Sequence, residues 1–203
     1  VFPCYLAMSS PLVVGDLVYV VTGNGVDHGS HKPPKPKAPS FLAVNKNTGK
    51  VVWQDASPGE AIMEGQWGNP SAYELKGSWQ VAFPGGDGVL YGFDAKTGKK
   101  VWEQPRRAFR ACYSTPLMRQ GKGGVELVVV SSAGPAGYEP ATGKLIWEHA
   151  WKFAANPLRT VASPVIADDL VLACSGDGKG DRHLVAVRPA QGSSAELAWE
   201  NTK

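Results

Sequence analysis

Short apolar runs alternate along this chain with clusters of glycine, proline and polar residues. The most apolar runs are four residues long, and near-continuous runs of this length are typical of β-strands buried on both faces. Each run follows a shorter strand-like segment that begins directly after a proline, where a strand does not yet need the missing N–H. The four runs are 18–21, 80–83, 127–130 and 170–173, and the four prolines are Pro11, Pro70, Pro116 and Pro164.

A second pattern completes each unit with two more strands. Three copies of Thr-Gly-Lys-x-x-Trp end at Trp53, Trp102 and Trp147, and a degraded fourth copy ends at Trp199. The Thr-Gly pair follows a strand-like segment, and glycine suits the positive φ of a tight hairpin. The tryptophan can place its ring between neighbouring sheets, with the indole N–H bonded to an acceptor. A strand-rich repeat of about fifty residues predicts a propeller or a similar repeat array.

The pattern therefore predicts an all-β chain that forms a single propeller region over residues 1–203. Each unit is a blade of four antiparallel strands. In such a blade the long connections emerge on one face and the compact turns on the other, so we expect the functional surface on the long-loop face. The blades are expected at 9–53, 68–102, 114–147 and 162–199.

Composition agrees with this fold and excludes other classes. The 24 glycines, 16 prolines and 7 tryptophans, with 19% charged residues, are typical of a turn-rich β protein. A net charge of +3 gives no support for nucleic-acid binding, which needs a clustered basic face. The apolar runs are strand-sized, so no transmembrane segment is predicted. Since the sequence opens without an initiator Met or a signal peptide, we expect a processed or excised chain.

The first repeat resembles a known family motif. The segment Ala43-x-Asn45-x-x-Thr48-Gly49-Lys50-x-x-Trp53 is similar to the repeat of the PQQ-type quinoprotein β-propellers. In that family the tryptophan docks one blade on the next. The fourth copy departs from the motif, because Gln191-Gly192 replaces Thr-Gly and three extra residues precede Trp199. The resemblance implies a periplasmic or secreted location.

The resemblance also bears on assembly. PQQ-like rings usually close with about seven or eight blades, whereas this chain holds four. An open half-ring exposes two apolar blade faces. We therefore expect a second copy of the chain or a protein partner to complete the propeller.

One group of residues resembles a quinone site. In quinoproteins the flat cofactor stacks on a tryptophan and its carboxylates meet arginine, which suits bidentate recognition. We expect the segments ahead of the four prolines to enter the central channel of the propeller, where Trp67 and Tyr113 each stand three residues before a proline. The alternative is that these two aromatic residues plug the channel and the arginines pair with Glu60, Glu64 or Glu103. The candidate cofactor-binding residues are Trp67, Arg110, Tyr113 and Arg159.

The longest loop holds a candidate metal site. Asp27, His28 and His31 combine a carboxylate with a His-x-x-His pair, and these ligand types suit zinc or copper. The alternative is a solvated loop, whose tail at 33–37 is a stiff polyproline-like spacer.

Two functions are consistent with these features. The first is a non-catalytic propeller that acts outside the cytoplasm as a binding scaffold through its loop face. The second is a fragment of a PQQ-dependent sugar or alcohol dehydrogenase, a quinone-dependent oxidoreductase in which calcium polarises the quinone carbonyl. The alcohol-oxidising members carry two adjacent cysteines, whereas Cys4, Cys112 and Cys174 are far apart, which favours the scaffold.

Overall fold

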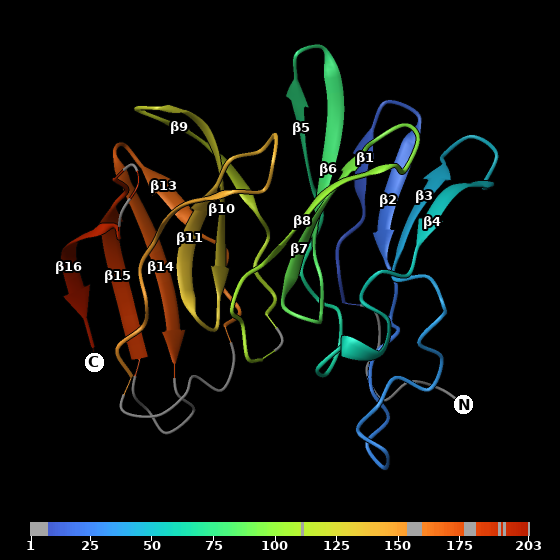
Figure 1. Cartoon of the computed structure of the whole chain (residues 1–203), viewed down its shortest axis with the longest axis horizontal. Helices are drawn as coiled ribbons and strands as arrows, with labels where there is room; N and C mark the ends of the chain where they lie inside the picture. Colours follow the sequence, from blue (N-terminus) through green and yellow to red (C-terminus); the bar gives the residue numbers. More distant parts are fainter. Residues whose placement is uncertain are drawn as a thin grey trace.

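The structure is a computed structural model that describes residues 8–110, 112–153, 160–176, 182–190, 192 and 194–202. Four separate sheets stand side by side, each with four strands in sequence order (Figure 1). Every pairing within a sheet is antiparallel. The prediction of an all-β fold built of four-stranded propeller blades is therefore confirmed.

The strands of the first two blades are β1 (Leu12–Val14), β2 (Leu17–Val21), β3 (Phe41–Asn45) and β4 (Val51–Asp55), then β5 (Ser71–Leu75), β6 (Ser78–Pro84), β7 (Val89–Asp94) and β8 (Lys100–Pro105). Those of the last two are β9 (Leu117–Gly121), β10 (Gly124–Ser131), β11 (Gly134–Tyr138) and β12 (Leu145–Glu148), then β13 (Val165–Ala167), β14 (Leu170–Gly176), β15 (Arg182–Arg188) and β16 (Glu196–Asn201). A short 3-10 helix, η1 (Gly59–Ala61), lies between the first two blades. Among the described residues no helix is both long and apolar enough to cross a membrane.

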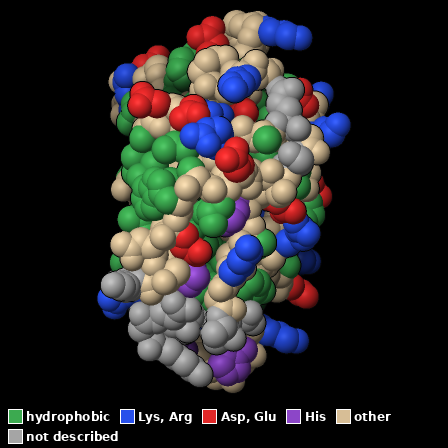
Figure 2. Space-filling view, turned by 90° about the vertical axis from the view of Figure 1, so that its left-hand side faces the viewer, with side chains coloured by type: hydrophobic (Ala, Val, Ile, Leu, Met, Phe, Trp, Pro, Cys, Tyr) green, Lys and Arg blue, Asp and Glu red, His purple; other side chains and the backbone are tan. Residues whose placement is uncertain are grey.

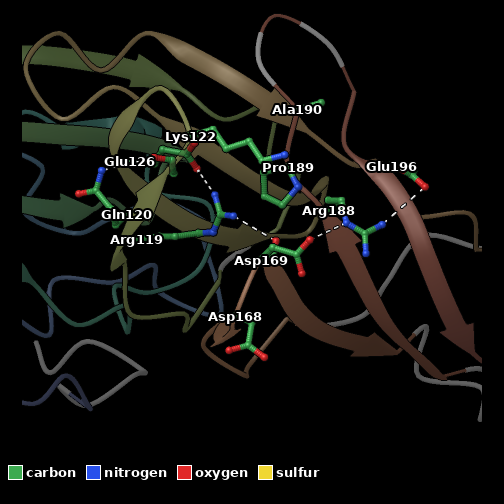
Figure 3. Close-up of a pocket in the computed structure, with 11 residues that line it drawn as sticks. Arg119, Gln120, Lys122, Glu126, Asp168, Asp169, Arg188, Pro189, Ala190 and Glu196 are labelled. Carbon is green, nitrogen blue, oxygen red and sulfur yellow. Dashed lines mark hydrogen bonds and ion pairs between the residues drawn. The ribbon is translucent and has the colours of Figure 1, made fainter.

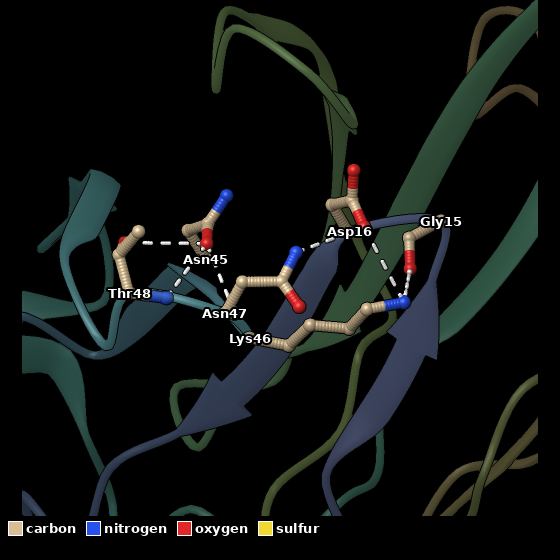
Figure 4. Close-up of polar contacts among 6 residues, drawn as sticks. All are labelled: Gly15, Asp16, Asn45, Lys46, Asn47 and Thr48. Carbon is tan, nitrogen blue, oxygen red and sulfur yellow. Dashed lines mark hydrogen bonds and ion pairs between the residues drawn. The ribbon is translucent and has the colours of Figure 1, made fainter.

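Side-chain hydrogen bonds fix the turn between the third and fourth strands of a blade. In the first blade the Asn45 Oδ1 atom accepts from the backbone N–H of Asn47 and of Thr48, both at 3.0 Å (Figure 4). Lys46 and Asn47 then reach across to the β1–β2 turn, where Lys46 Nζ donates to the Gly15 carbonyl at 2.8 Å. Asn and Asp stabilise turns by bonding their own backbone in this way.

The core lies in three layers, one between each pair of adjacent blades. Between the first two blades the rings of Phe41 and Phe83 stack with centroids 4.5 Å apart, and both side chains are fully buried. Burial of aromatic surface on both sides of a sheet holds the blades together without any covalent link.

Two of the repeat tryptophans dock their blade on the next one. Trp53 Nε1 donates to the Ala95 carbonyl of the second blade, and Trp102 Nε1 donates to the Pro140 carbonyl of the third, each at 2.9 Å. A tyrosine hydroxyl from the same blade reaches each of these carbonyls at 3.1 Å, from Tyr19 and Tyr73 respectively. The expectation of a docked indole bonded to an acceptor is confirmed at these two junctions.

The residues before the four prolines form a second connection between blades. The backbone N–H of Ser10 donates to Asn69 Oδ1 at 2.6 Å, and Asn69 Nδ2 donates to Thr115 Oγ1 at 2.7 Å. The N–H of Thr115 then donates to Ser163 Oγ at 2.9 Å. This hydrogen-bonded chain, here called the inner belt, runs through all four blades in order.

Candidate functional site

The predicted cofactor residues Trp67 and Tyr113 lie against each other. Their rings are stacked with centroids 4.6 Å apart and planes inclined by 6°. Trp67 lies on the segment that leads into β5, and only 4% of its surface is exposed. Gly65 also abuts the indole, because a Cβ at this position would lie 2.4 Å from Trp67 Cζ2. The geometry brings these two predicted residues together as a packed pair.

Arg110 has an acidic partner. Its Nη1 atom lies 3.6 Å from Glu64 Oε1, and both side chains are partly exposed. Glu64 also anchors the longest loop, since its carbonyl accepts the N–H of Val26 at 2.7 Å. Arg159, the fourth predicted cofactor residue, lies outside the described residues. The pairing of Arg110 with Glu64 corresponds to the alternative considered from the sequence.

These contacts test whether a quinone fits here. A flat cofactor such as PQQ needs an accessible aromatic face and an arginine available to its carboxylates. Trp67 is instead covered by Tyr113, and Arg110 is paired with Glu64. The described residues therefore do not fit a stacked quinone in this arrangement.

The predicted metal residues share one turn of the 22–40 loop. The Asp27 carboxylate accepts from the Gly29 N–H at 3.3 Å and from the Ser30 hydroxyl at 3.4 Å. The His31 N–H closes the turn on the Asp27 carbonyl at 2.8 Å. Within the part of the chain that the structure describes, no three His, Cys, Asp or Glu side chains are grouped to hold a metal. Metal binding by Asp27, His28 and His31 stays a prediction.

The third blade holds a buried ion pair that the sequence analysis did not single out. Arg119 of β9 and Glu126 of β10 face each other in register, with Arg119 Nη1 3.1 Å from Glu126 Oε2. Their side chains are only 7% and 5% exposed. The same two positions hold Tyr73 and Gln80 in the second blade. Opposite charges at facing positions of one hairpin were the available sign of this site.

The third docking tryptophan contacts this ion pair. Trp147 is 1% exposed, and its Nε1 donates to Glu126 Oε2 at 2.8 Å within its own blade. Arg119 crosses the junction instead, since its Nη2 donates to the Asp169 carbonyl of the fourth blade at 3.1 Å. The ring of Trp147 packs between the third and fourth blades as expected, but its N–H bonds a carboxylate of its own blade and not a backbone carbonyl of the next one.

Comparison with known proteins identifies the relatives of this chain. Two overlapping stretches, residues 6–121 and 40–202, match the family model described as "Outer membrane protein assembly factor BamB". Tetrathionate hydrolase of Acidithiobacillus ferrooxidans is 24% identical over 179 residues, which cover 81% of this chain and 33% of that protein.

Solved structures share the fold. BamB from Moraxella catarrhalis superposes with a TM-score of 0.64 at 22% identity, over 99% of this chain and 50% of that one. Quinohemoprotein alcohol dehydrogenase ADHIIG from Pseudomonas putida HK5 gives a TM-score of 0.62 at 17% identity, over 100% of this chain and 35% of that one. This chain thus spans half or less of the length of these relatives. Because the two matched stretches together cover nearly the whole sequence, the chain belongs to the BamB-like family of PQQ-type β-propeller repeat proteins.

Proposed function

We propose that this chain is part of a non-catalytic propeller that binds other proteins through its long-loop face. The observation that carries the proposal is the stacking of Trp67 on Tyr113. In a quinone enzyme of this family an aromatic face would be available to the cofactor, whereas here an aromatic side chain of the protein covers it. Membership of a family described by an assembly factor also supports a protein-binding role.

The long-loop face has a surface suited to such binding. The connections between blades and the 22–40 loop lie at the end of the blades opposite the compact hairpins (Figure 1). The 22–40 loop is held from within, because Asn24 Nδ2 donates to the Lys35 carbonyl at 3.2 Å. Its tip, residues 28–32, is exposed. An exposed loop tip on an anchored base can contact a partner with little ordering cost.

The cofactor alternative has a direct test. Adding PQQ and calcium to the purified chain should give neither a shifted quinone absorbance nor dye-linked oxidation of alcohols and sugars. The variant Tyr113→Ala uncovers one face of Trp67 and serves as the matched comparison. A tight quinone complex with turnover in the unmodified chain would favour the dehydrogenase alternative and overturn the scaffold proposal.

The scaffold role is tested by replacing the exposed loop tip. A Gly-Ser replacement of residues 28–32 should abolish the capture of a specific protein from a cell-envelope extract. The matched control replaces Lys46 and Asn47, which lie in a compact turn on the opposite face (Figure 4). Equal loss of capture in both variants would contradict binding through the long-loop face.

We also propose that further blades complete the ring, supplied by a second copy of the chain or by a protein partner. Figure 2 shows hydrophobic side chains gathered on the face at the β16 end. Leu184 and Trp199 of this blade are 40% and 43% exposed, whereas Trp147, which is covered by the fourth blade, is 1% exposed. Ser163 ends the inner belt here, in position to continue it to another blade.

Light scattering at several concentrations tests this assembly. A mass near twice 21.6 kDa is expected if two copies pair. A mass near 21.6 kDa that does not change when an envelope extract is added would contradict completion of the ring by a second copy or by a protein partner. We further propose a periplasmic or secreted location, which the family description supports and which fractionation of cells that produce the parent protein would test.

A further inference from the structure

A cavity of about 720 Å³ opens between the third and fourth blades, at the compact-turn end and away from the long loops. Figure 3 shows the side chains that line it. The corresponding groove between the first two blades measures about 320 Å³ and is lined by Leu17, Tyr19 and Ala95 among others. The junction of the last two blades is therefore both roomier and far more polar than the first.

The third junction also differs from the first two at the turn where the fourth repeat departs from the family motif. At the first two junctions the turn glycine of the next blade packs on the docking tryptophan. A Cβ on Gly98 would lie 2.5 Å from Trp53, and a Cβ on Gly143 would lie 2.5 Å from Trp102. Gly192 is the equivalent glycine of the fourth blade, and a Cβ there would meet nothing within 4 Å. The Gly192 turn therefore does not pack on Trp147 in the way that its counterparts pack on Trp53 and Trp102.

The floor of the cavity is the buried Arg119–Glu126 pair. Arg119 uses its two terminal nitrogens for Glu126 and for the Asp169 carbonyl. Its Nε atom has no hydrogen-bond partner among the described residues, although the atom is buried. A buried guanidinium N–H without an acceptor is costly, so Arg119 has unused hydrogen-bonding capacity next to the cavity.

The wall on the fourth blade carries further fixed charges. Arg188 Nε lies 2.7 Å from Asp169 Oδ2, and Arg188 Nη1 lies 3.6 Å from Glu196 Oε1 (Figure 3). The hydrogen bond from Arg188 lowers the pKa of the Asp169 carboxyl, and Lys122 contributes a smaller effect in the same direction. The Asp169 carboxylate therefore remains anionic at neutral pH.

Two lining charges make no ion pair with another described residue. Lys122 lies in the β9–β10 turn of the third blade, and Asp168 lies in the β13–β14 turn of the fourth. They stand on opposite sides of the junction and have opposite signs. The cavity thus offers one unpaired cation and one unpaired anion at its rim, with the Arg119 side chain at its floor.

The charge balance decides which ligand fits. Three cations and four acids line the cavity, so a polyanion would face the acids and a polycation would face the cations. A ligand with one charge of each sign satisfies both walls. Its carboxylate would accept from Lys122 and Arg119, and its ammonium group would meet Asp168.

We propose that the cavity between the third and fourth blades binds a small zwitterion of the amino-acid or short-peptide class. The volume falls in the range of small-molecule pockets, about 300–1,000 Å³. The site is independent of the proposed scaffold function, because it lies at the opposite end of the blades and is built only from residues of this chain.

Titration calorimetry of the full chain with trialanine tests the proposal. The zwitterionic peptide should bind saturably with one site per chain. N-acetyl-trialanine lacks the ammonium group and trialanine amide lacks the carboxylate, so each should bind about tenfold more weakly. Absence of saturable trialanine binding at millimolar concentration overturns the proposal, and so does equal binding of either blocked peptide.

Matched variants locate the binding. Lys122→Gln and Asp168→Asn remove the two rim charges at exposed turn positions, and each should weaken trialanine binding about tenfold. Lys76→Gln and Asp16→Asn change the same residue types in the corresponding turns of the first two blades and should leave binding unchanged. If the control variants weaken binding as much as the rim variants, the peptide binds elsewhere and the assignment is wrong.

Discussion

Trp147 donates its indole N–H to Glu126, the carboxylate that also faces Arg119, whereas Trp53 and Trp102 donate to backbone carbonyls of the next blade. The first two junctions are thus closed by a neutral hydrogen bond and ring packing. The third is bridged by a guanidinium. The third junction, which carries the charged cavity, therefore differs from the first two in how its blades are joined.

Removing the charge of Glu126 tests the role of the buried pair. Glu126→Gln should lower the free energy of unfolding by about 3–5 kcal/mol, because it leaves the Arg119 guanidinium buried without a counter-charge. The double variant R119Y/E126Q reproduces the Tyr73–Gln80 pair of the second blade and should recover most of the loss. Urea denaturation measures both. A single variant no less stable than the exposed control Glu139→Gln would contradict a structural role for the pair.

The turn glycines provide a matched pair of substitutions. Gly143 and Gly192 have φ of +72° and +71°, so alanine at either position is strained by about 1–2 kcal/mol. Gly143→Ala should cost more, because its new methyl group meets Trp102, whereas the methyl group of Gly192→Ala meets open space. The two free energies of unfolding, measured in urea, should differ in that order by about 1 kcal/mol or more, because only the Gly143 variant creates a methyl-sized overlap. Equal losses would mean that Gly143 does not hold the docked indole.

The aromatic pair Trp67–Tyr113 should depend mainly on ring stacking. Tyr113→Ala is expected to lower the free energy of unfolding by about 2 kcal/mol, since it removes a stacked ring from a buried indole. Tyr113→Phe keeps the ring and should lose clearly less free energy of unfolding than Tyr113→Ala. Thermal or urea unfolding distinguishes the two. A large loss in the phenylalanine variant would assign the role to the hydroxyl instead.

Acid stability should depend on Asp94 in the second-blade turn. The Thr97 hydroxyl donates to Asp94 Oδ1 at 2.6 Å and lowers the pKa of this carboxyl below its ordinary 3.8. Since the folded pKa lies below the unfolded one, the stabilisation is present above pH 3.8 and is lost as the pH falls through the folded pKa.

The variant Asp94→Asn isolates this effect, because Asn45 occupies the same position in the first blade and forms the same turn. The free energy of unfolding of the unmodified chain, relative to this variant, should fall as the pH is lowered below 3.8. Urea titrations at a series of acidic pH values give the comparison. A difference that does not change with pH would show that the Asp94 charge does not stabilise the turn.

Local sequence patterns determined the repeating part of this protein. Strand length, the proline at each strand start and the Thr-Gly turn depend on neighbouring residues in the chain, so four blades could be predicted from them. The docking of Trp53 and Trp102 followed from their place in the repeat. Trp67 and Tyr113 were expected in one region, because both stand three residues before a proline.

The tertiary structure decided how these residues are used. Whether Trp67 offers a face to a cofactor or stacks on Tyr113 depends on the spacing of two blades, which no local pattern contains. Similarly, the sequence gives no sign that Arg119 and Glu126 are buried. The fourth blade covers them only in the tertiary structure. The same pair lies at the floor of the cavity between these two blades. The sequence determined each blade because a blade is closed by its own hydrogen bonds, whereas the sites lie between blades, where side chains distant in sequence meet.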